Sequence, residues 1–364
     1  MEYLRFGRTD LSVSRLCLGT MSMGNPACKS WVLDEQRSVP ILRRALDLGI
    51  TFFDMADWYC LGRNEEVVGR NLLKFVPRNR LVLATKVYYP MSDDLADRGL
   101  SRQHLLASID RSLTRLGTDH VDLYIIHAFD ADTPVAETME TLQQIVKAGK
   151  ARYLGASTMY AWQYNLLYRE EEREMIPYCD DEGIVVSAFS PLARGYLGGA
   201  DGTARTAVDH YRAFYGGDID REIAQRVPTL AARRGVSAAH IAMAWVASST
   251  RVAVPVIGVS ATGQVDAAVE AAALALSAEE RAFLEEPHRP RDMTNDCNPV
   301  RRPRALTAGP KPSWSRQPGN GARSDAAGTR SVADGACPGL AGGAVHLNRR
   351  GRSATAPAGK LHLR

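Results

Sequence analysis

Four polar side chains, each at or just after the end of an apolar run, have types that suit acid–base chemistry on a carbonyl group. They are Asp54, Tyr59, Lys86 and His127. An ammonium group close to a tyrosine favours the phenolate and lowers the pKa of the hydroxyl from about 10. The set therefore predicts a proton donor, a cation that tunes it, a counter-ion, and an imidazole that orients a carbonyl oxygen.

Each of these residues also has a purely structural interpretation. A lysine at the end of a buried strand needs a counter-charge, so Lys86 and Asp54 could form a salt bridge that seals the mouth of the fold. Tyr59 alone could be a packing residue, and His127 alone could be a core histidine. The presence of all four at strand ends is harder to explain by packing and favours chemistry.

The elements that would position these side chains follow a strand–helix alternation. Strands are expected at 16–19, 51–56, 81–87, 120–127, 152–157, 184–190 and 254–259, and helices at 35–48, 65–73, 101–116, 135–148, 169–181, 220–234, 238–248 and 263–273. Such alternation favours parallel strands with right-handed crossovers. The predicted fold class is α/β, a (β/α)8 TIM-type barrel, in which the loops after the strands build the active face.

One helix–strand unit is expected to be missing near residue 163. Only seven strands precede residue 260, and the eleven residues between Ser157 and Arg169 are too few for a crossover and a strand. The barrel would then expose two strand edges or close on seven strands with altered tilt. Either outcome predicts marginal stability, aggregation and weak cofactor binding.

The composition changes at Arg289, where Arg, Pro, Gly and Ala become dominant. Residues 289–364 carry 14 Lys/Arg and 4 Asp/Glu, which leaves 31 and 37 in residues 1–288 and a net charge of −6 there. The prediction is a barrel domain over 1–288 and a disordered basic tail over 289–364. A functional basic tail and a product of an altered reading frame are the alternatives for this segment.

Several functional classes are not expected. The acidic net charge of 1–288 disfavours a nucleic-acid partner. The six cysteines form no Cys-x-x-Cys pair, so no metal site is expected, and they are read as reduced thiols of a cytoplasmic protein. No apolar run approaches the ~18–20 residues that span a bilayer, so no membrane partner is expected. The sequence also lacks a Gly-x-Gly-x-x-Gly fingerprint, a Walker A motif and a Gly-x-Ser-x-Gly motif.

From about Met1 to Pro287 the chain resembles the aldo-keto reductases, in particular the branch that contains aryl-alcohol dehydrogenases and potassium-channel β subunits. The matching segments are 19–21 (GTM), 54–59, 100–102 (LSR), 115–122 (RLGTDHVD), 147–153 (KAGKARY), 164–166 (YNL), 190–195 (SPLARG) and 257–260 (IGVS). The resemblance implies a (β/α)8 barrel and NADP(H)-dependent reduction of a small-molecule aldehyde or ketone to an alcohol.

The resemblance also implies roles for individual residues. Tyr59 would be the general acid, Lys86 would tune it, Asp54 would pair with Lys86, and His127 would orient the carbonyl oxygen. The residues implied at the NADP(H) site are Gly19, Thr20, Met21, Asp54, Ser157, Phe189, Ser190, Leu192, Arg194, Ser260 and Gln264. Without the resemblance, each of these would be read as an ordinary loop or packing residue.

The chain departs from the family pattern at two places. The helix, the strand and the nicotinamide-packing Gln that normally follow Gly155-Ala156-Ser157 are absent, and Gln163 corresponds to the start of the lost helix rather than to that Gln. The chain also continues far beyond Pro287, where the family usually ends. Two other functions stay open: a cofactor-binding regulatory subunit with little turnover, and an inactive truncated reductase. The physiological substrate and the oligomeric state are not predicted.

Overall fold

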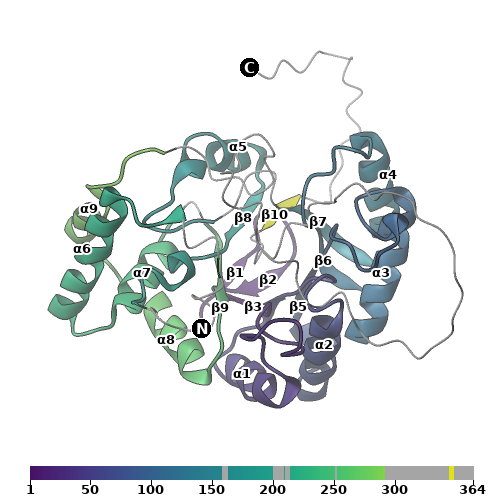
Figure 1. The fold of residues 1–364 in the computed structure, drawn as a ribbon, viewed down its shortest axis with the longest axis horizontal. Coiled ribbons are helices and arrows are strands. Elements are labelled where there is room, and N and C mark those ends of the chain that lie inside the picture. Colours follow the sequence, from purple (N-terminus) through teal and green to yellow (C-terminus); the bar gives the residue numbers. More distant parts are fainter. Residues whose placement is uncertain (158–162, 200–208, 210–213, 251, 292–343, 348–364) are drawn as a thin grey trace, which may run out of the picture.

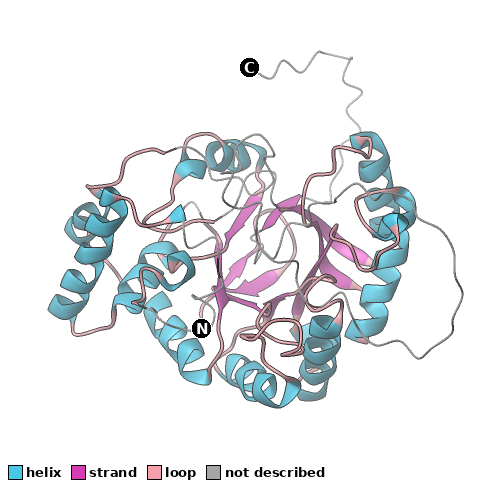
Figure 2. Ribbon diagram, viewed as in Figure 1, coloured by secondary structure: helices cyan, strands magenta, loops and turns pink. Residues whose placement is uncertain are grey.

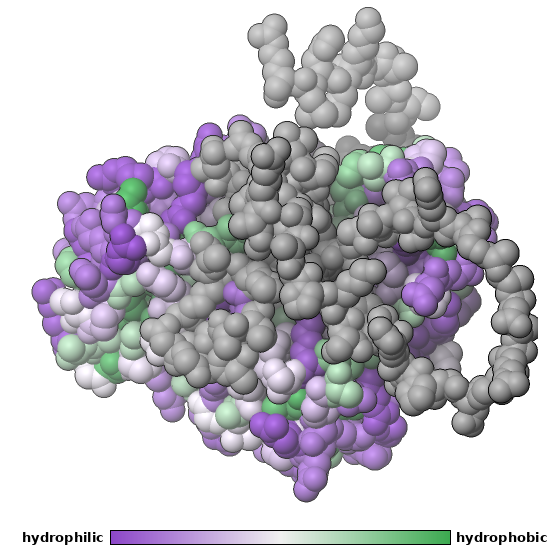
Figure 3. Space-filling model, in the orientation of Figure 1, coloured by the Kyte–Doolittle hydropathy of each residue, from purple (hydrophilic) through white to green (hydrophobic). Residues whose placement is uncertain are grey.

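The computed structural model describes residues 1–157, 163–199, 209, 214–250 and 252–291, together with the backbone of one strand at 344–347. In this part of the chain a ring of strands is surrounded by helices (Figures 1 and 2). In the space-filling view the outer surface over α1 and α2 (Figure 3, bottom) is mainly hydrophilic. The apolar faces of the helices therefore point towards the strands.

Seven strands of the ring are parallel, as the alternation predicts. They are β3 (Cys17–Gly19), β4 (Phe52–Asp54), β5 (Val82–Val87), β6 (Val121–Ile126), β7 (Ala151–Ala156), β8 (Val185–Ala188) and β9 (Val254–Gly258). Their parallel pairings run from β7 through β6, β5, β4, β3 and β9 to β8. The carboxyl ends of all seven strands therefore meet at one end of the barrel.

The helices lie outside the strands, and most of them begin and end close to the predicted positions; α5 begins later than predicted, and α9 was not predicted. They are α1 (Glu35–Asp47), α2 (Arg63–Phe75), α3 (Arg102–Leu116), α4 (Val135–Lys147), α5 (Met175–Glu182), α6 (Asp218–Arg234), α7 (Ala238–Ala247), α8 (Thr262–Ala272) and α9 (Ala278–Glu285). The Ser101 hydroxyl caps α3 by accepting a hydrogen bond from the His104 N–H, as its position before the helix predicts.

Consecutive strand residues belong to two different apolar clusters. Phe52 and Val82 pack in one cluster, whereas their neighbours Phe53 and Leu83 pack in the other. Because side chains alternate across a strand, one cluster fills the barrel and the other lies between the strands and the helices. The barrel is therefore a packed core.

A short hairpin at the N-terminus covers the barrel end opposite the predicted active face. Strands β1 (Tyr3–Arg5) and β2 (Ser12–Ser14) pair in antiparallel fashion. Phe6, between them, meets Phe52 edge to face with ring centroids 5.6 Å apart. Since Phe52 is the first residue of β4, the hairpin covers the amino ends of the strands (Figure 1). The sequence reading did not predict this hairpin.

The gap in the barrel is filled in a way that the sequence reading did not anticipate. Strand β10 (Ala344–Leu347) lies between β7 and β8 and is antiparallel to both, with Val345 opposite Ala156 and Val186. The barrel therefore closes on eight strands, not seven, and the two edges expected to be open are paired. Unpaired N–H and C=O groups on β7 and β8 offer a template for any extended segment, which explains the antiparallel fit.

The expected missing unit is nevertheless absent from its usual place. No strand is described between β7 and β8 in chain order, and residues 158–162 lie outside the described part. The predicted helix at 169–181 is also divided: a 3-10 turn at Glu170–Glu172 precedes α5. The prediction of a disordered tail falls mostly on residues outside the described ones, and it differs from the structure at β10.

Candidate active site

Lys86, near the end of β5, connects the predicted catalytic residues. Its ammonium nitrogen donates to Asp54 Oδ2 at 2.7 Å, to the Met55 carbonyl at 2.7 Å and to the Tyr59 hydroxyl at 3.3 Å. Parallel pairing sets Asp54 beside Ala84, two residues before Lys86, so both side chains point to the same face of the sheet. The three acceptors occupy the three donors of the ammonium group.

The cluster is almost completely removed from water. Lys86 is 0 % exposed, Tyr59 is 3 % exposed and Asp54 is 4 % exposed. Burial alone would lower the pKa of Lys86, but the Asp54 carboxylate and the Tyr59 oxygen outweigh it and hold the pKa above its ordinary value. Lys86 therefore keeps its positive charge next to the Tyr59 hydroxyl.

His127 joins the same cluster from the neighbouring strand. It directly follows β6, and its backbone N–H donates to the Val87 carbonyl at 2.8 Å. Its ring lies edge-on to Tyr59, with ring centroids 5.9 Å apart, and is fully buried. The structure thus brings together all four residues singled out from the sequence.

Two aromatic residues complete the wall around His127, and the sequence reading did not name them for this site. Tyr89 lies edge-on to the imidazole with centroids 4.9 Å apart, and Trp58 lies 4.9 Å from Tyr89. The available signal was their position, since Trp58 precedes Tyr59 and Tyr89 comes two residues after the end of β5. Tyr89 thus packs against the imidazole, and Trp58 packs against Tyr89.

The loop that carries Tyr59 is held to the barrel rim and is locally strained. The Met55 N–H donates to the Ala84 carbonyl at 2.9 Å, and the Asp57 N–H donates to the Lys86 carbonyl at 3.1 Å. The next residues, Cys60 and Leu61, both have a φ of 50°, which is uncommon outside glycine. Such strain often accompanies functional loops that the surroundings over-determine.

A cavity of about 70 Å³ opens beside Tyr59. Its walls come from the loop after β3 and the loop after β4: Met21, Cys28, Lys29, Val32, Trp58, Tyr59, Cys60 and Leu61. Most of these side chains are apolar or aromatic, as in sites for small organic molecules. Tyr59 is the only member of the predicted catalytic set that lines this cavity.

The predicted cofactor residues follow four neighbouring positions of the barrel. Gly19 is the last residue of β3, and Thr20 and Met21 follow it. Ser157 follows β7, Phe189, Ser190, Leu192 and Arg194 follow β8, and Ser260 and Gln264 follow β9. Since β3, β9, β8, β10 and β7 are adjacent in the ring, these residues form one arc of the carboxyl-end rim. The catalytic residues on β4, β5 and β6 occupy the rest of the rim.

Ser157 and Thr20 differ in how their hydroxyl groups are satisfied. The Ser157 hydroxyl is buried and has no hydrogen-bond partner among the described residues, although its N–H donates to the Ile126 carbonyl. A buried hydroxyl without a partner fits a site that awaits a polar ligand group. Thr20 instead donates to the Asp54 carbonyl at 2.9 Å and is held by Asn64, which the sequence reading missed. Hydrogen bonds thus tie Thr20 to Asp54 and Asn64 at the rim.

The segment after β8 takes a backbone path that is unusual for its residues. Ser190 and Arg194 have φ values of 56° and 55°. The Arg194 guanidinium is paired with Asp209, with 3.0 Å between Nη1 and Oδ2. By contrast, Ser260 and Gln264 are exposed, and the Ser260 N–H donates to Gln264 Oε1 at 2.7 Å. These two residues are therefore near each other at the start of α8.

Gln163 does not begin a helix in the structure. It forms an isolated parallel bridge with Phe189, and the next residue, Tyr164, donates its N–H to the Phe189 carbonyl at 3.2 Å. The Gln163 side-chain oxygen accepts a hydrogen bond from the Tyr215 hydroxyl at 2.9 Å. Residues 163 and 164 thus continue the barrel wall beside the end of β8.

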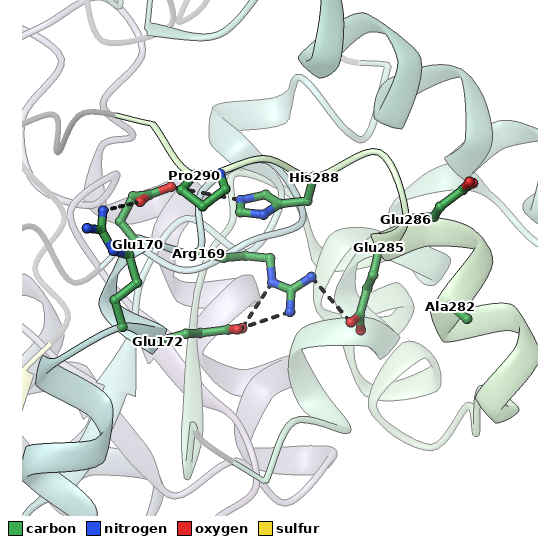
Figure 4. Close-up of a pocket in the computed structure, with 9 residues that line it drawn as sticks. Arg169, Glu170, Glu172, Ala282, Glu285, Glu286, His288 and Pro290 are labelled. Carbon is green, nitrogen blue, oxygen red and sulfur yellow. Dashed lines mark hydrogen bonds and ion pairs between the residues drawn. The ribbon is translucent and has the colours of Figure 1, made fainter.

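A larger cavity, of about 570 Å³, lies away from this cluster between the turn at Glu170–Glu172 and α9 (Figure 4). Arg169 crosses it, pairing with both oxygens of Glu172 at 3.0 Å and with Glu285 at 3.2 Å. Arg169 thus bridges two carboxylates and ties the turn to α9. The cavity therefore has the character of a structural ion-pair network.

A parallel β/α barrel with a buried lysine, carboxylate and tyrosine at its carboxyl end defines a class of barrel oxidoreductases. Comparison with known proteins agrees: the family model described as "Aldo/keto reductase family" matches residues 15–287, and the chain belongs to that family. The family membership supports an enzyme that oxidises or reduces carbonyl compounds, and its members generally use NAD(P)H.

The chain aligns with almost the whole length of several named relatives. The chain is 37% identical to the versiconal hemiacetal acetate reductase of Aspergillus parasiticus over 80% of this chain and 98% of the relative. It is 36% identical to the aldo-keto reductase dtxS3 of Metarhizium robertsii (79% and 90% covered) and 36% identical to a putative aryl-alcohol dehydrogenase of Schizosaccharomyces pombe (78% and 95%).

Within the described residues, no helix is long and apolar enough to cross a membrane. In the same part of the chain, no group of three or more His, Cys, Asp or Glu side chains is arranged to hold a metal ion.

Proposed function

We propose that this chain reduces an aldehyde or ketone carbonyl of a small molecule to an alcohol with NADPH, and that Tyr59 is the general acid. The observation that carries the proposal is the position of Lys86, whose ammonium lies 3.3 Å from the Tyr59 hydroxyl and 2.7 Å from Asp54. A fixed positive charge beside a tyrosine stabilises the phenolate that proton donation leaves behind.

The role of each side chain follows from its contacts. Tyr59 gives its proton to the carbonyl oxygen of a substrate in the adjoining cavity. Lys86 holds the resulting phenolate, and Asp54 keeps Lys86 charged and oriented. His127, edge-on to Tyr59, orients the carbonyl oxygen. When bound, the reduced nicotinamide supplies the hydride that the carbonyl carbon accepts.

The rim residues after β7, β8, β9 and β3 would hold the cofactor. Ser157 would offer its buried hydroxyl to the carboxamide, and Phe189 would pack against the nicotinamide ring. Ser190, Leu192 and Arg194 would line the pyrophosphate path, and Gly19, Thr20 and Met21 would border it. Ser260 and Gln264 would meet the adenosine end with its 2′-phosphate. The support is the unpartnered Ser157 hydroxyl and the continuous arc that these residues form.

The aromatic lining of the cavity by Trp58 and Tyr59 favours a flat, apolar carbonyl compound as substrate. The names of two relatives, an aryl-alcohol dehydrogenase and a hemiacetal acetate reductase, are compatible with that class. A cytoplasmic location is part of the same proposal, because NADPH and reduced thiols both belong to that compartment.

The test uses the full chain, NADPH or NADH, and an aromatic aldehyde such as benzaldehyde. We expect quenching of protein fluorescence on NADPH binding, and NADPH oxidation that depends on the aldehyde. NADPH binding without turnover would support the regulatory-subunit alternative. Absence of binding would support the inactive-reductase alternative, which the missing unit between β7 and β8 motivates. A preference for NADH would overturn the choice of cofactor.

A further inference from the structure

Two cysteines face each other across the loops that border Tyr59. Cys28 lies in the loop between β3 and α1, and Cys60 directly follows Tyr59 in the loop between β4 and α2. Both are partly exposed, and both line the cavity beside Tyr59. Both residues also contact the Asn25 carbonyl, Cys28 through its N–H and Cys60 through its sulfur. They are therefore adjacent in space although 31 intervening residues separate them in the sequence.

The backbone around them holds this arrangement. The Asn25 carbonyl accepts the Cys28 N–H at 2.9 Å and also lies 3.7 Å from Cys60 Sγ. A Cβ atom at Gly24 would come within 3.1 Å of Cys60 Sγ, so glycine at this position lets the sulfur approach the loop. Cys60 has a left-handed backbone, with a φ of 50°.

The two thiols differ in acidity. The neighbouring Cys60 thiol lowers the pKa of Cys28 to about 7 against the effect of burial, and the Asn25 backbone and the Lys29 ammonium add to the lowering. The same contact and burial raise the pKa of Cys60. At neutral pH, Cys28 is therefore a partial thiolate next to a neutral thiol, the arrangement of an attacking sulfur and a resolving sulfur.

The other described cysteines have a different environment. Cys17 and Cys179 are buried, and burial raises the pKa of both thiols. They are thus protonated and shielded from oxidants at neutral pH. The difference between the two pairs makes a specific reaction at Cys28 and Cys60 possible.

We propose that Cys28 and Cys60 form a redox-sensitive pair that closes to a disulfide when a peroxide is present and thereby restricts access to Tyr59. The Cys28 thiolate attacks one oxygen of the peroxide, the O–O bond breaks, and Cys28 becomes a sulfenic acid while the second oxygen leaves as hydroxide. The Cys60 sulfur then attacks the Cys28 sulfur, an S–S bond forms, and water leaves with the Cys60 proton. One peroxide thus oxidises two thiols.

The consequence for the site follows from chain connectivity. A disulfide would tie the loop after β3 to the residue bonded to Tyr59, across the cavity that both loops line. We expect the disulfide to lower turnover. This expected effect rests on the proposed reductase function, whereas formation of the disulfide does not. The experiment therefore measures the two separately.

The first measurement treats the full chain with one equivalent of hydrogen peroxide, blocks free thiols with N-ethylmaleimide and digests with trypsin. We expect a cross-link between peptides 16–29 and 45–63, with fragment ions that assign the bond to Cys28 rather than to Cys17. Cys28→Ser and Cys60→Ser should each abolish it, and the buried-cysteine control Cys179→Ser should retain it. A double Cys297→Ser/Cys337→Ser variant should also retain it. If both sulfurs are recovered as N-ethylmaleimide adducts, the pair is not redox-active.

The second measurement compares NADPH-dependent turnover before and after peroxide within each variant. In the wild-type chain we expect a loss of about tenfold or more, reversed by dithiothreitol, because displacement of a catalytic group by about 1 Å has large effects. Cys28→Ser should lose this sensitivity, and Cys179→Ser should keep it. Full disulfide with unchanged turnover would overturn the control of access. A chain without any turnover would contradict the proposed function. The cross-link measurement would still show whether Cys28 and Cys60 form a disulfide.

Discussion

The ammonium nitrogen of Lys86 lies 3.3 Å from the hydroxyl oxygen of Tyr59, and both side chains are almost fully buried. The lysine comes from β5 and the tyrosine from the loop after β4. Two neighbouring strands of the barrel thus place a charged donor and a weak acid together without a metal ligand set in the described residues. The relationship links the fold to the proposed proton transfer.

Replacement of Tyr59 by phenylalanine removes the hydroxyl and keeps the ring beside His127. We expect turnover to fall by at least ~10²-fold, because general-acid catalysis contributes about that much, while NADPH affinity stays nearly unchanged. Steady-state kinetics on an aromatic aldehyde and a fluorescence titration with NADPH measure the two quantities. Undiminished carbonyl reduction by this variant would exclude Tyr59 as the acid.

The buried pair of Asp54 and Lys86 should show strong coupling in stability. Asp54→Asn or Lys86→Met alone should lower the free energy of unfolding by about 3–5 kcal/mol, because each leaves one partner buried without its counter-charge. The double variant should be less destabilised than the sum of the two. Urea denaturation of the four chains gives the cycle. The exposed pair Arg44–Asp266 is the matched control, where Asp266→Asn should change stability by less than about 1 kcal/mol.

Strand β10 should stabilise the barrel. A chain that ends at Arg291 lacks the strand between β7 and β8, so we expect a lower urea midpoint and aggregation through the two open edges. A chain that ends at Leu347 is the control and should unfold like the full chain. Limited proteolysis offers a second readout, since cleavage within 292–343 should leave the C-terminal fragment bound to the core. Equal midpoints for both truncations would show that β10 adds nothing.

Glu171 should make the stability pH-dependent. Burial, aided by the nearby Glu170, raises the pKa of Glu171 to about 7, above the 4.5 of an ordinary glutamate. The folded chain holds this proton more tightly than the unfolded chain, so the contribution of Glu171 to stability is fully present below about pH 4.5 and is lost as the pH rises through 7. The loss is up to about 3 kcal/mol.

Glu171→Gln should flatten this dependence, because the amide does not ionise. Urea midpoints at pH 5 and pH 8 for the wild-type chain, for Glu171→Gln and for the exposed control Glu182→Gln measure the difference. Parallel pH profiles for wild type and Glu171→Gln would contradict the assignment.

The sequence predicts well those parts of the fold that depend on local periodicity. Within residues 35–273, most of the β-branched runs form strands and most of the amphipathic segments form helices. Local periodicity predicts them because each element buries one face against the next. The position of Lys86 and Asp54 could be predicted because parallel strands end at one rim. The contacts of Tyr89 with His127 could not, since ring orientation depends on tertiary packing.

The origin of the eighth strand was beyond prediction for a different reason. The tail has no alternation of apolar residues that specifies a strand, and the pairing of β10 is set by the edges of β7 and β8 rather than by the tail itself. The hairpin β1–β2 was missed because its strands, YLR and SVS, contain no continuous apolar run. The path of Gln163 was missed because it depends on Phe189, 26 residues later.

The antiparallel strand β10 has a consequence for the order of events during synthesis. Its partners β7 and β8 leave the ribosome first, because β10 begins at Ala344, 156 residues after β8 ends at Ala188. At a rate of about 5–20 residues per second, roughly ten seconds or more pass between the two. Throughout that interval the nascent barrel has an unclosed seam, and chaperones that shield exposed strand edges would act there.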